Sequence, residues 1–150
     1  MAHSYTSTLM HYVFSTKDRQ KRISTDLRER LWPFMGGIAR KNDMKAVAVG
    51  GTDDHAHALL SLPSTLSVAK AVQLIKGGSS KWVNDAFPAH RGFGWQEGYG
   101  ASSIGISDVP RTVEYIHNQE DHHRTKTFEE EFVSFLKKHG IEYDERYVWG

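Results

Sequence analysis

In this chain of 150 residues, the strongest constraint on the fold is the order of the predicted strands and helices. Short runs of β-branched and aromatic residues predict strands, and apolar residues spaced three and four apart predict helices. The predicted order is strand, helix, strand, strand, helix, strand, over residues 9–14, 28–41, 45–49, 55–62, 67–86 and 98–107. This β-α-β-β-α-β order is that of the ferredoxin-like fold, which belongs to the α+β class.

Two further helices are predicted after this core. The stretch from Ser107 to Pro110 is a helix-start signal, and the helix it begins runs to about His122. A second helix covers residues 127–138 and ends before Gly140. The chain has no internal repeat, and its length suits one hydrophobic core, so we expect residues 1–150 to form a single domain.

The chain contains no cysteine. This excludes disulfides, thiolate metal ligands and cysteine nucleophiles, and it fits a reducing cytoplasm. No run approaches the roughly 18 apolar residues of a membrane-spanning helix, and the polar stretch from Met1 to Thr8 lacks the core of a signal peptide. We therefore expect a cytoplasmic protein with no membrane partner.

Charge is spread unevenly along the chain, although the net charge is only +1. Residues 17–45 contain nine Lys and Arg against four Asp and Glu, whereas residues 112–150 contain five against nine. A basic first half is suited to phosphate, and an acidic tail to solvent or a partner. Two solvated helix faces would explain the same pattern, so charge alone leaves both interpretations open.

Two short motifs indicate chemistry. A strand has a period of two, so His55 and His57 face the same side of the sheet, where their neutral nitrogens can bind one divalent cation. A helix has a period of 3.6, so Tyr115 and Gln119 share one helix face a turn apart. Asp53 and Asp54, beside the histidines, are carboxylates that can orient or join the ligands of a metal. On the residues alone, a chance pair or two hydrogen-bonded polar side chains is the more common explanation of two such histidines.

Tyr115 is the candidate nucleophile. A phenol has a pKa near 10 and attacks poorly unless a cation is close to the reaction centre. A single helical tyrosine is more often a core aromatic, and other tyrosines are available in this chain, namely Tyr12, Tyr99, Tyr143 and Tyr147.

The chain resembles a known family through an ordered set of segments that covers nearly its whole length. These are residues 11–17, 54–57, 74–82, 95–101, 115–124 and 139–147. In this order the segments resemble the single-tyrosine transposases of the HUH class, in which two histidines flank one hydrophobic residue. More narrowly, the chain looks like the insertion-sequence-two-hundred-like family, which includes the REP-associated tyrosine transposases.

The resemblance implies a fold, a metal site and a reaction. It implies an antiparallel sheet with helices on one face, to which the C-terminal helices are added. His55, His57 and Gln119 would hold Mg²⁺ or Mn²⁺, with His122 and His123 at most supporting them. Tyr115 would attack a phosphodiester of single-stranded DNA near a hairpin, giving a 5′-phosphotyrosine and a free 3′-OH.

The resemblance also implies partners. Relatives form homodimers in which the helix carrying the tyrosine completes the site of the partner subunit, and we expect the same of the Tyr115 helix. Lys17 and Arg19 after the first strand, and Lys76 and Lys81 on the second helix, are candidate DNA-binding residues. Solvated surface charge is the alternative for each of them. The protein would act in a prokaryotic cytoplasm and join the nucleoid when bound to DNA.

Two other functions remain open from the sequence. A ferredoxin-like protein that binds hairpin DNA without cutting it would serve as a repressor or an architectural module. A metal-dependent hydrolase that uses water would leave Tyr115 with a structural role and form no covalent adduct. The presence of all four candidate residues, His55, His57, Tyr115 and Gln119, favours the transposase.

Overall fold

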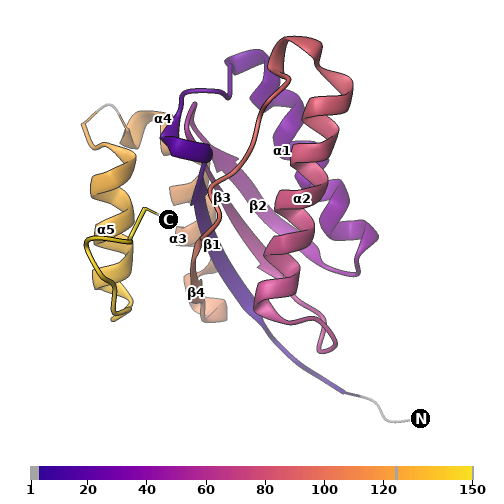
Figure 1. The fold of residues 1–150 in the computed structure, drawn as a ribbon. Helices are drawn as coiled ribbons and strands as arrows, with labels where there is room; N and C mark the ends of the chain where they lie inside the picture. Colours follow the sequence, from indigo (N-terminus) through magenta and orange to yellow (C-terminus); the bar gives the residue numbers. More distant parts are fainter. Residues whose placement is uncertain (1–3, 124, 150) are drawn as a thin grey trace.

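The computed structural model describes residues 4–123 and 125–149 and contains one four-stranded sheet (Figure 1). Its strands are β1 (Leu9–Ser15), β2 (Lys45–Gly51), β3 (His55–Ser61) and β4 (Gly100–Ser103). The order across the sheet is β2-β3-β1-β4, and every neighbouring pair is antiparallel. This confirms the predicted α+β fold with an antiparallel sheet. Met1 to His3, Arg124 and Gly150, which the single-domain prediction includes, lie outside the described residues.

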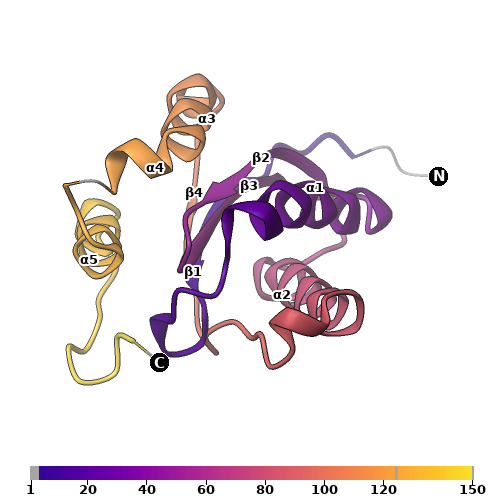
Figure 2. The ribbon, with the colours of Figure 1, turned by 90° about the horizontal axis from the view of Figure 1, so that it is seen from above.

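Two long helices cover one face of the sheet (Figure 2). They are α1 (Thr25–Lys41) and α2 (Val68–Ala86), which begin after Ser24 and Ser67. Each serine side chain accepts a hydrogen bond from a backbone N–H of the first turn, which caps the helix. The apolar stripes of both helices pack on the largest hydrophobic cluster, to which the sheet contributes Tyr12, Phe14, Ala56, Ala58 and Leu60.

The C-terminal helices cover the opposite face (Figure 2). They are α3 (Val109–His117), α4 (Gln119–His122) and α5 (Phe128–Lys138). Helix α3 places Ile116 in a cluster with Leu9, Ala48 and Leu59, and α5 packs Phe128, Phe132, Phe135 and Leu136 against Val13. The sheet is therefore buried on both faces, and its two faces contact different helices.

Two element boundaries differ clearly from the sequence prediction, and the others agree within three residues. The single helix predicted to reach His122 is interrupted at Asn118, whose φ and ψ of −99° and 22° separate α3 from α4. The last strand, predicted over residues 98–107, is paired only from Gly100 to Ser103, because the chain beyond it turns into the short helix η3 (Ile106–Asp108). The remaining short helices are η1 (Lys17–Arg19) and η2 (Pro88–His90). Within the described residues, no helix combines the length and the apolar character needed to cross a membrane.

Candidate active site

His55 and His57 lie side by side on the face of β3 that α3 and α5 cover, and both side chains are almost completely buried. The alternation of the strand explains this placement, since Ala56 and Ala58 point to the opposite, apolar layer. The neighbouring strand β1 presents His11 on the same side as the pair. Three imidazoles therefore occupy a part of the sheet that would otherwise be apolar.

One ring nitrogen of each histidine of the pair is held by a neighbouring side chain. The Nδ1 of His55 lies 2.8 Å from Oδ1 of Asp54 and 3.0 Å from Oγ1 of Thr52. The Nδ1 of His57 lies 2.9 Å from Nε2 of His11. A proton donated from Nδ1 fixes the ring and leaves the Nε2 lone pair available to a metal. These neighbours give His55 and His57 the surroundings typical of metal-binding histidines.

The helix break at Asn118 places Gln119, the predicted oxygen ligand, beside the histidines, and α3 places Tyr115, the predicted nucleophile, next to them. The Oε1 of buried Gln119 lies 2.9 Å from Nε2 of His55, and its amide group donates to the carbonyl of Tyr115 over 3.2 Å. The half-buried Tyr115 ring meets the His57 ring edge-on, with 5.5 Å between the ring centroids. The structure thus brings all four predicted catalytic and metal-site residues together within one chain.

Gly50 allows α3 to approach the sheet closely enough for this arrangement. A Cβ atom at residue 50 would lie 2.7 Å from the backbone oxygen of Ile116 and 3.0 Å from its side chain. Ile116 directly follows Tyr115, and Gly50 is paired with His57 across the β2–β3 ladder. The missing side chain therefore sets the position of the tyrosine relative to the histidine pair.

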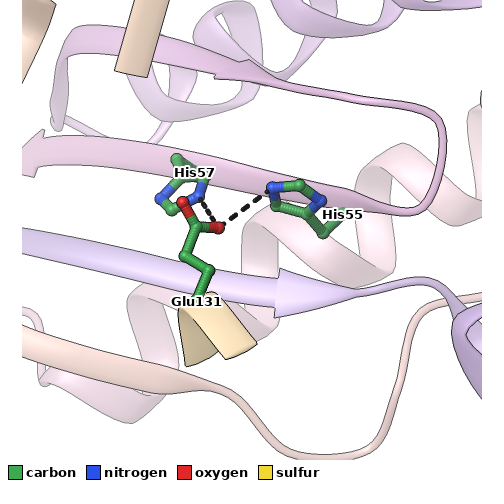
Figure 3. A group of neighbouring side chains, drawn as sticks. All are labelled: His55, His57 and Glu131. Carbon is green, nitrogen blue, oxygen red and sulfur yellow. Dashed lines mark hydrogen bonds and ion pairs between the residues drawn. The ribbon is translucent and has the colours of Figure 1, made fainter. Parts of the chain in front are cut away.

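Glu131 completes the cluster, and the sequence analysis missed it (Figure 3). Its side chain, only 3% exposed, projects from α5. Its Oε1 lies 3.1 Å from Nε2 of His57 and 3.3 Å from Nε2 of His55, and its Oε2 accepts a hydrogen bond from the Tyr115 hydroxyl. One sequence signal points to it, because Glu131 lies among the phenylalanines of the apolar stripe of a predicted helix.

Two more histidines contact the same carboxylate. The Nε2 of His123 lies 3.0 Å from Oε1 of Glu131, and the Nε2 of His122 lies 3.4 Å from Oε2. His117, in contrast, is exposed on another side of α3. His122 and His123 therefore border the cluster, and His117 does not.

The charges of the cluster are strongly coupled. Burial alone would raise the pKa of Glu131, but hydrogen bonds from His123, His55 and His57 hold it far below its usual range. Burial alone would lower the pKa of His55, but hydrogen bonds with Asp54 and Glu131 raise it to about 9. The carboxylate therefore stays ionised, and it lies among groups that can be positively charged.

Tyr115, His57 and His11 are held in their neutral forms. Burial, followed by the charge of Glu131, raises the pKa of Tyr115. Burial is also the main cause that lowers the pKa of His57 and of His11. The Tyr115 phenol thus keeps its proton unless positive charge is supplied next to it.

The residues present fit a divalent cation. Two imidazole nitrogens and one amide oxygen form a mixed nitrogen and oxygen donor set, which suits a divalent transition metal or Mg²⁺ with positions left for other ligands. His55, His57 and Glu131 each have a donor atom within 4.8 Å of the other two.

The predicted DNA-binding residues divide between two parts of the molecule. Lys17 and Arg19 lie in η1, and Arg19 stacks over Trp149 and lies 3.6 Å from the carboxylate of Glu129 on α5. Lys76 and Lys81 lie on α2, across the sheet from the histidines. Of these four residues, Arg19 is the one shown in contact with a helix of the site.

The α2 lysines have local partners. Half-buried Lys76 donates from Nζ to the carbonyl oxygens of Gly98 and Glu97, over 2.8 and 3.2 Å. Exposed Lys81 pairs with Asp85 one turn later, at 2.7 Å. Burial lowers the pKa of Lys76 to about 8.

A groove of about 560 Å³ lies beside the cluster. Asp54 and His123 line it, so it borders the histidine site directly. Its basic lining residues are Arg19, Lys21, Arg28 and Lys126. Five carboxylates, those of Asp18, Asp53, Asp54, Glu120 and Glu129, line it as well, so the groove carries mixed charge, with cations available to phosphate among acidic groups.

Comparison with known proteins identifies the family that this chain matches. Residues 4–119 match the family described as IS200-like transposases. The chain is 24% identical over 125 residues to the transposase of insertion sequence element IS200 from Salmonella typhimurium, covering 79% of this chain and 81% of that protein. It is 22% identical over 116 residues to the ISDra2 transposase TnpA of Deinococcus radiodurans, covering 74% and 83%.

Two solved structures share the fold. One is a candidate transposase from Deinococcus radiodurans R1, with a TM-score of 0.63, 23% identity, and coverage of 79% of this chain and 96% of that chain. The other is a REP-associated tyrosine transposase bound to a REP hairpin, with a TM-score of 0.60, 16% identity, and coverage of 82% and 73%.

Proposed function

The chain belongs to the IS200-like transposase family, and from this premise we propose that it cuts and rejoins single-stranded DNA near hairpins through a covalent bond to Tyr115. The observation that supports this most directly is the meeting of Tyr115 with the His55 and His57 pair inside one buried cluster. A tyrosine with only a packing role in the core does not require two buried imidazoles and a buried carboxylate beside its ring.

In the proposed reaction, the Tyr115 oxygen attacks the scissile phosphorus. A phosphorus–oxygen bond forms to the tyrosine, and the bond from phosphorus to the 3′ oxygen breaks. The phenol loses its proton, and the departing 3′ oxygen gains one and becomes a 3′-OH. The 5′-phosphotyrosine retains the energy of the phosphodiester, so a 3′-OH can reverse the step and rejoin the strand without ATP.

His55, His57 and Gln119 would hold a divalent metal, for which we propose Mg²⁺ or Mn²⁺. When bound, such a cation neutralises a phosphate oxygen and aligns the phosphate for in-line displacement. Asp54 and His11 orient the two imidazoles from their Nδ1 sides. Gln119 also donates to the Tyr115 carbonyl, so it links the ligand set to the helix that carries the nucleophile.

DNA would reach the site along the groove beside Asp54 and His123. We assign phosphate contacts there to Arg19 and the neighbouring Lys17. Lys76 and Lys81 lie on the other side of the sheet. We propose that they contact phosphates of the hairpin that flanks the cleavage site. The protein would do this in a prokaryotic cytoplasm, where the DNA lies.

A covalent-adduct assay tests the proposal. Single-stranded hairpin DNA labelled at its 3′ end is incubated with the protein and Mg²⁺ or Mn²⁺, and an SDS-stable shifted band is sought. We expect a band that requires metal, disappears in Tyr115→Phe and persists in the control Tyr147→Phe, whose ring is exposed. A 5′ label should not shift, because the protein joins the downstream fragment.

Other results of this assay would identify a different function. Cleavage that persists in Tyr115→Phe without a band would indicate a hydrolase that uses water. Binding without cleavage or a band would indicate a non-catalytic hairpin-binding protein.

We further propose that the protein acts as a homodimer, with the Tyr115 helix completing the partner's site. Mixing two inactive variants tests this arrangement. Tyr115→Phe retains the histidine pair, and His57→Ala retains the tyrosine, so a mixed dimer regains one complete site only if the tyrosine acts in trans. Recovery of adduct formation supports exchange of the helices, whereas continued inactivity supports a site built within one chain.

A further inference from the structure

We propose that Glu131 is a further ligand of the catalytic cation through Oε1, and that its Oε2 holds the Tyr115 hydroxyl beside that cation. Helix α5, which lies beyond the β-α-β-β-α-β core, would then be part of the metal centre. The inference rests on the proposed function, because it concerns the same metal site and the same nucleophile.

The spacing of the donor atoms supports a direct bond. Ligand bonds of about 2.1 Å at right angles place neighbouring donor atoms of an octahedral cation about 3 Å apart. The Oε1 of Glu131 lies 3.1 and 3.3 Å from the Nε2 atoms of His57 and His55, and Gln119 Oε1 lies 2.9 Å from the latter. The distances from Glu131 Oε1 to the two histidine nitrogens therefore match the distances between neighbouring ligands of one cation.

The charge balance around Glu131 supports the same conclusion. Among the described residues, the side chains shown to contact its carboxylate are four histidines and Tyr115, without a lysine or an arginine. Histidines that bind a metal do so as neutral imidazoles. A divalent cation at the Nε2 atoms of His55 and His57 would place positive charge directly beside this buried carboxylate.

The packing of α5 keeps the carboxylate in this position. Phe128 and Phe132, on either side of Glu131 in the sequence, are buried in the cluster that joins α5 to Val13 of β1. Thr127 and Glu130 form a capping box at the start of the helix. A cation bound between the histidines would therefore meet Glu131 unless its side chain turned away or the helix moved.

The second oxygen connects the metal centre to the nucleophile. Oε2 accepts a hydrogen bond from the Tyr115 hydroxyl, while Oε1 faces His55 and His57. A single carboxylate thus bridges the two functional parts of the site. In this arrangement Glu131 is a positioning residue for Tyr115 as well as a metal ligand.

The competing possibility is that Glu131 occupies the metal position and must leave before a cation can bind. The two roles predict opposite changes in metal affinity. Loss of a charged ligand weakens binding of the metal, whereas loss of an occupying carboxylate leaves it unchanged or strengthens it. Metal binding can be measured without DNA, so the test does not depend on catalysis.

The experiment titrates Mn²⁺ into the full-length protein, monitored by calorimetry and by the EPR signal of free Mn²⁺. The variants are Glu131→Gln, which preserves shape, and the control Glu130→Gln, which keeps an oxygen acceptor for the exposed cap. We expect Glu131→Gln to weaken Mn²⁺ binding about 10- to 100-fold, on the scale seen when the surroundings of a metal ligand are altered. Glu130→Gln should bind as the wild type does.

A crystal of the wild-type protein grown with Mn²⁺ gives a second result that does not depend on any variant folding. An anomalous peak at a bonding distance of about 2.1 Å from Glu131 Oε1 supports the inference. Unchanged or tighter Mn²⁺ binding by Glu131→Gln, or a peak bonded to the histidines with Glu131 turned away, overturns it. Either of these leaves the Tyr115 mechanism intact, whereas a missing adduct with normal Mn²⁺ binding counts against the mechanism alone.

Discussion

The Nε2 of His11 lies 2.9 Å from the Nδ1 of His57, across the antiparallel ladder of β1 and β3. The hydrogen bond joins two buried imidazoles, so one must donate and the other accept. Burial lowers the pKa of His11 well below its ordinary value, which keeps this imidazole neutral and able to accept. His11 therefore fixes the ring whose other nitrogen faces Glu131 and the proposed metal site.

Replacing His11 should weaken metal binding although it is not itself a ligand. In His11→Ala the Nδ1 of His57 loses its buried partner, so the ring is less well oriented. We expect Mn²⁺ affinity to fall about 10- to 100-fold, as for other partners of metal-binding histidines. Calorimetric titration measures this, with His90→Ala in η2 as the control. Equal affinity in wild type and His11→Ala would mean that the strand alone orients His57.

The Asp54 carboxylate should control the protonation of His55 in the chelator-treated protein. Hydrogen bonding to Asp54 is a main cause that raises the pKa of His55 from 6.5 to about 9, against the effect of burial. Because the folded-state pKa is raised, this contribution to stability is complete below pH 6.5 and is lost as pH rises through about 9. Asp54→Asn should therefore lower the pKa of His55 and reduce this dependence of stability on pH, while Glu131 maintains part of it.

Two measurements check the Asp54 prediction. NMR titration of the His55 ring should give a lower pKa in Asp54→Asn than in the wild type. Urea unfolding should give a difference in stability that is larger at acidic pH than above about pH 9. A difference in stability that is constant over this range would contradict the linkage.

Adding one methyl group at residue 50 should damage both stability and catalysis. The Cβ of Gly50→Ala would lie 2.7 Å from the carbonyl oxygen of Ile116, which is backbone and cannot simply rotate away. We expect a loss of about 1–3 kcal/mol in the free energy of unfolding, together with reduced adduct formation as α3 shifts. The matched control is Gly77→Ala in α2, where the added Cβ meets nothing within 4 Å. That change should stabilise the protein by roughly 1 kcal/mol through helix propensity.

Lys76 should make the free energy of unfolding increase with pH between about 8 and 10.5. Burial lowers its pKa from 10.5 to about 8, so the unfolded chain binds more protons between these values. Stability should therefore rise with pH across that window through this residue. Lys76→Met should lose the rise, and Lys70→Met, at an exposed position of the same helix, should keep it. Urea unfolding at pH values across the window provides the measurement.

Local sequence patterns were sufficient to predict most of the fold. Strands and helices follow from periodicity within short windows, and the order of β1 to β4 follows from the sequence of elements. The break at Asn118 was not predictable in the same way, because the residues around it continue a helical pattern. It depends on packing, since Gln119 is buried against His55 rather than continuing α3.

The site was predictable only where its residues carry a motif. His55 and His57 are close in sequence, and Gln119 follows Tyr115 by one helical turn. Glu131 reaches the same cluster from α5 and lies 74 residues beyond His57 in the sequence. No local sequence pattern predicts which strand that helix packs against. For the same reason the sequence did not separate Arg19, near the site, from Lys76 and Lys81 across the sheet.

The strict alternation of β3 has a consequence for changes in chain length. His55 and His57 face the polar cluster because Ala56 and Ala58 face the apolar layer. Inserting or deleting one residue within the strand would exchange these two sets, burying imidazoles among α1 and α2 and presenting methyl groups to Tyr115. The strand should thus accept conservative substitutions on its apolar side yet reject any single-residue insertion or deletion.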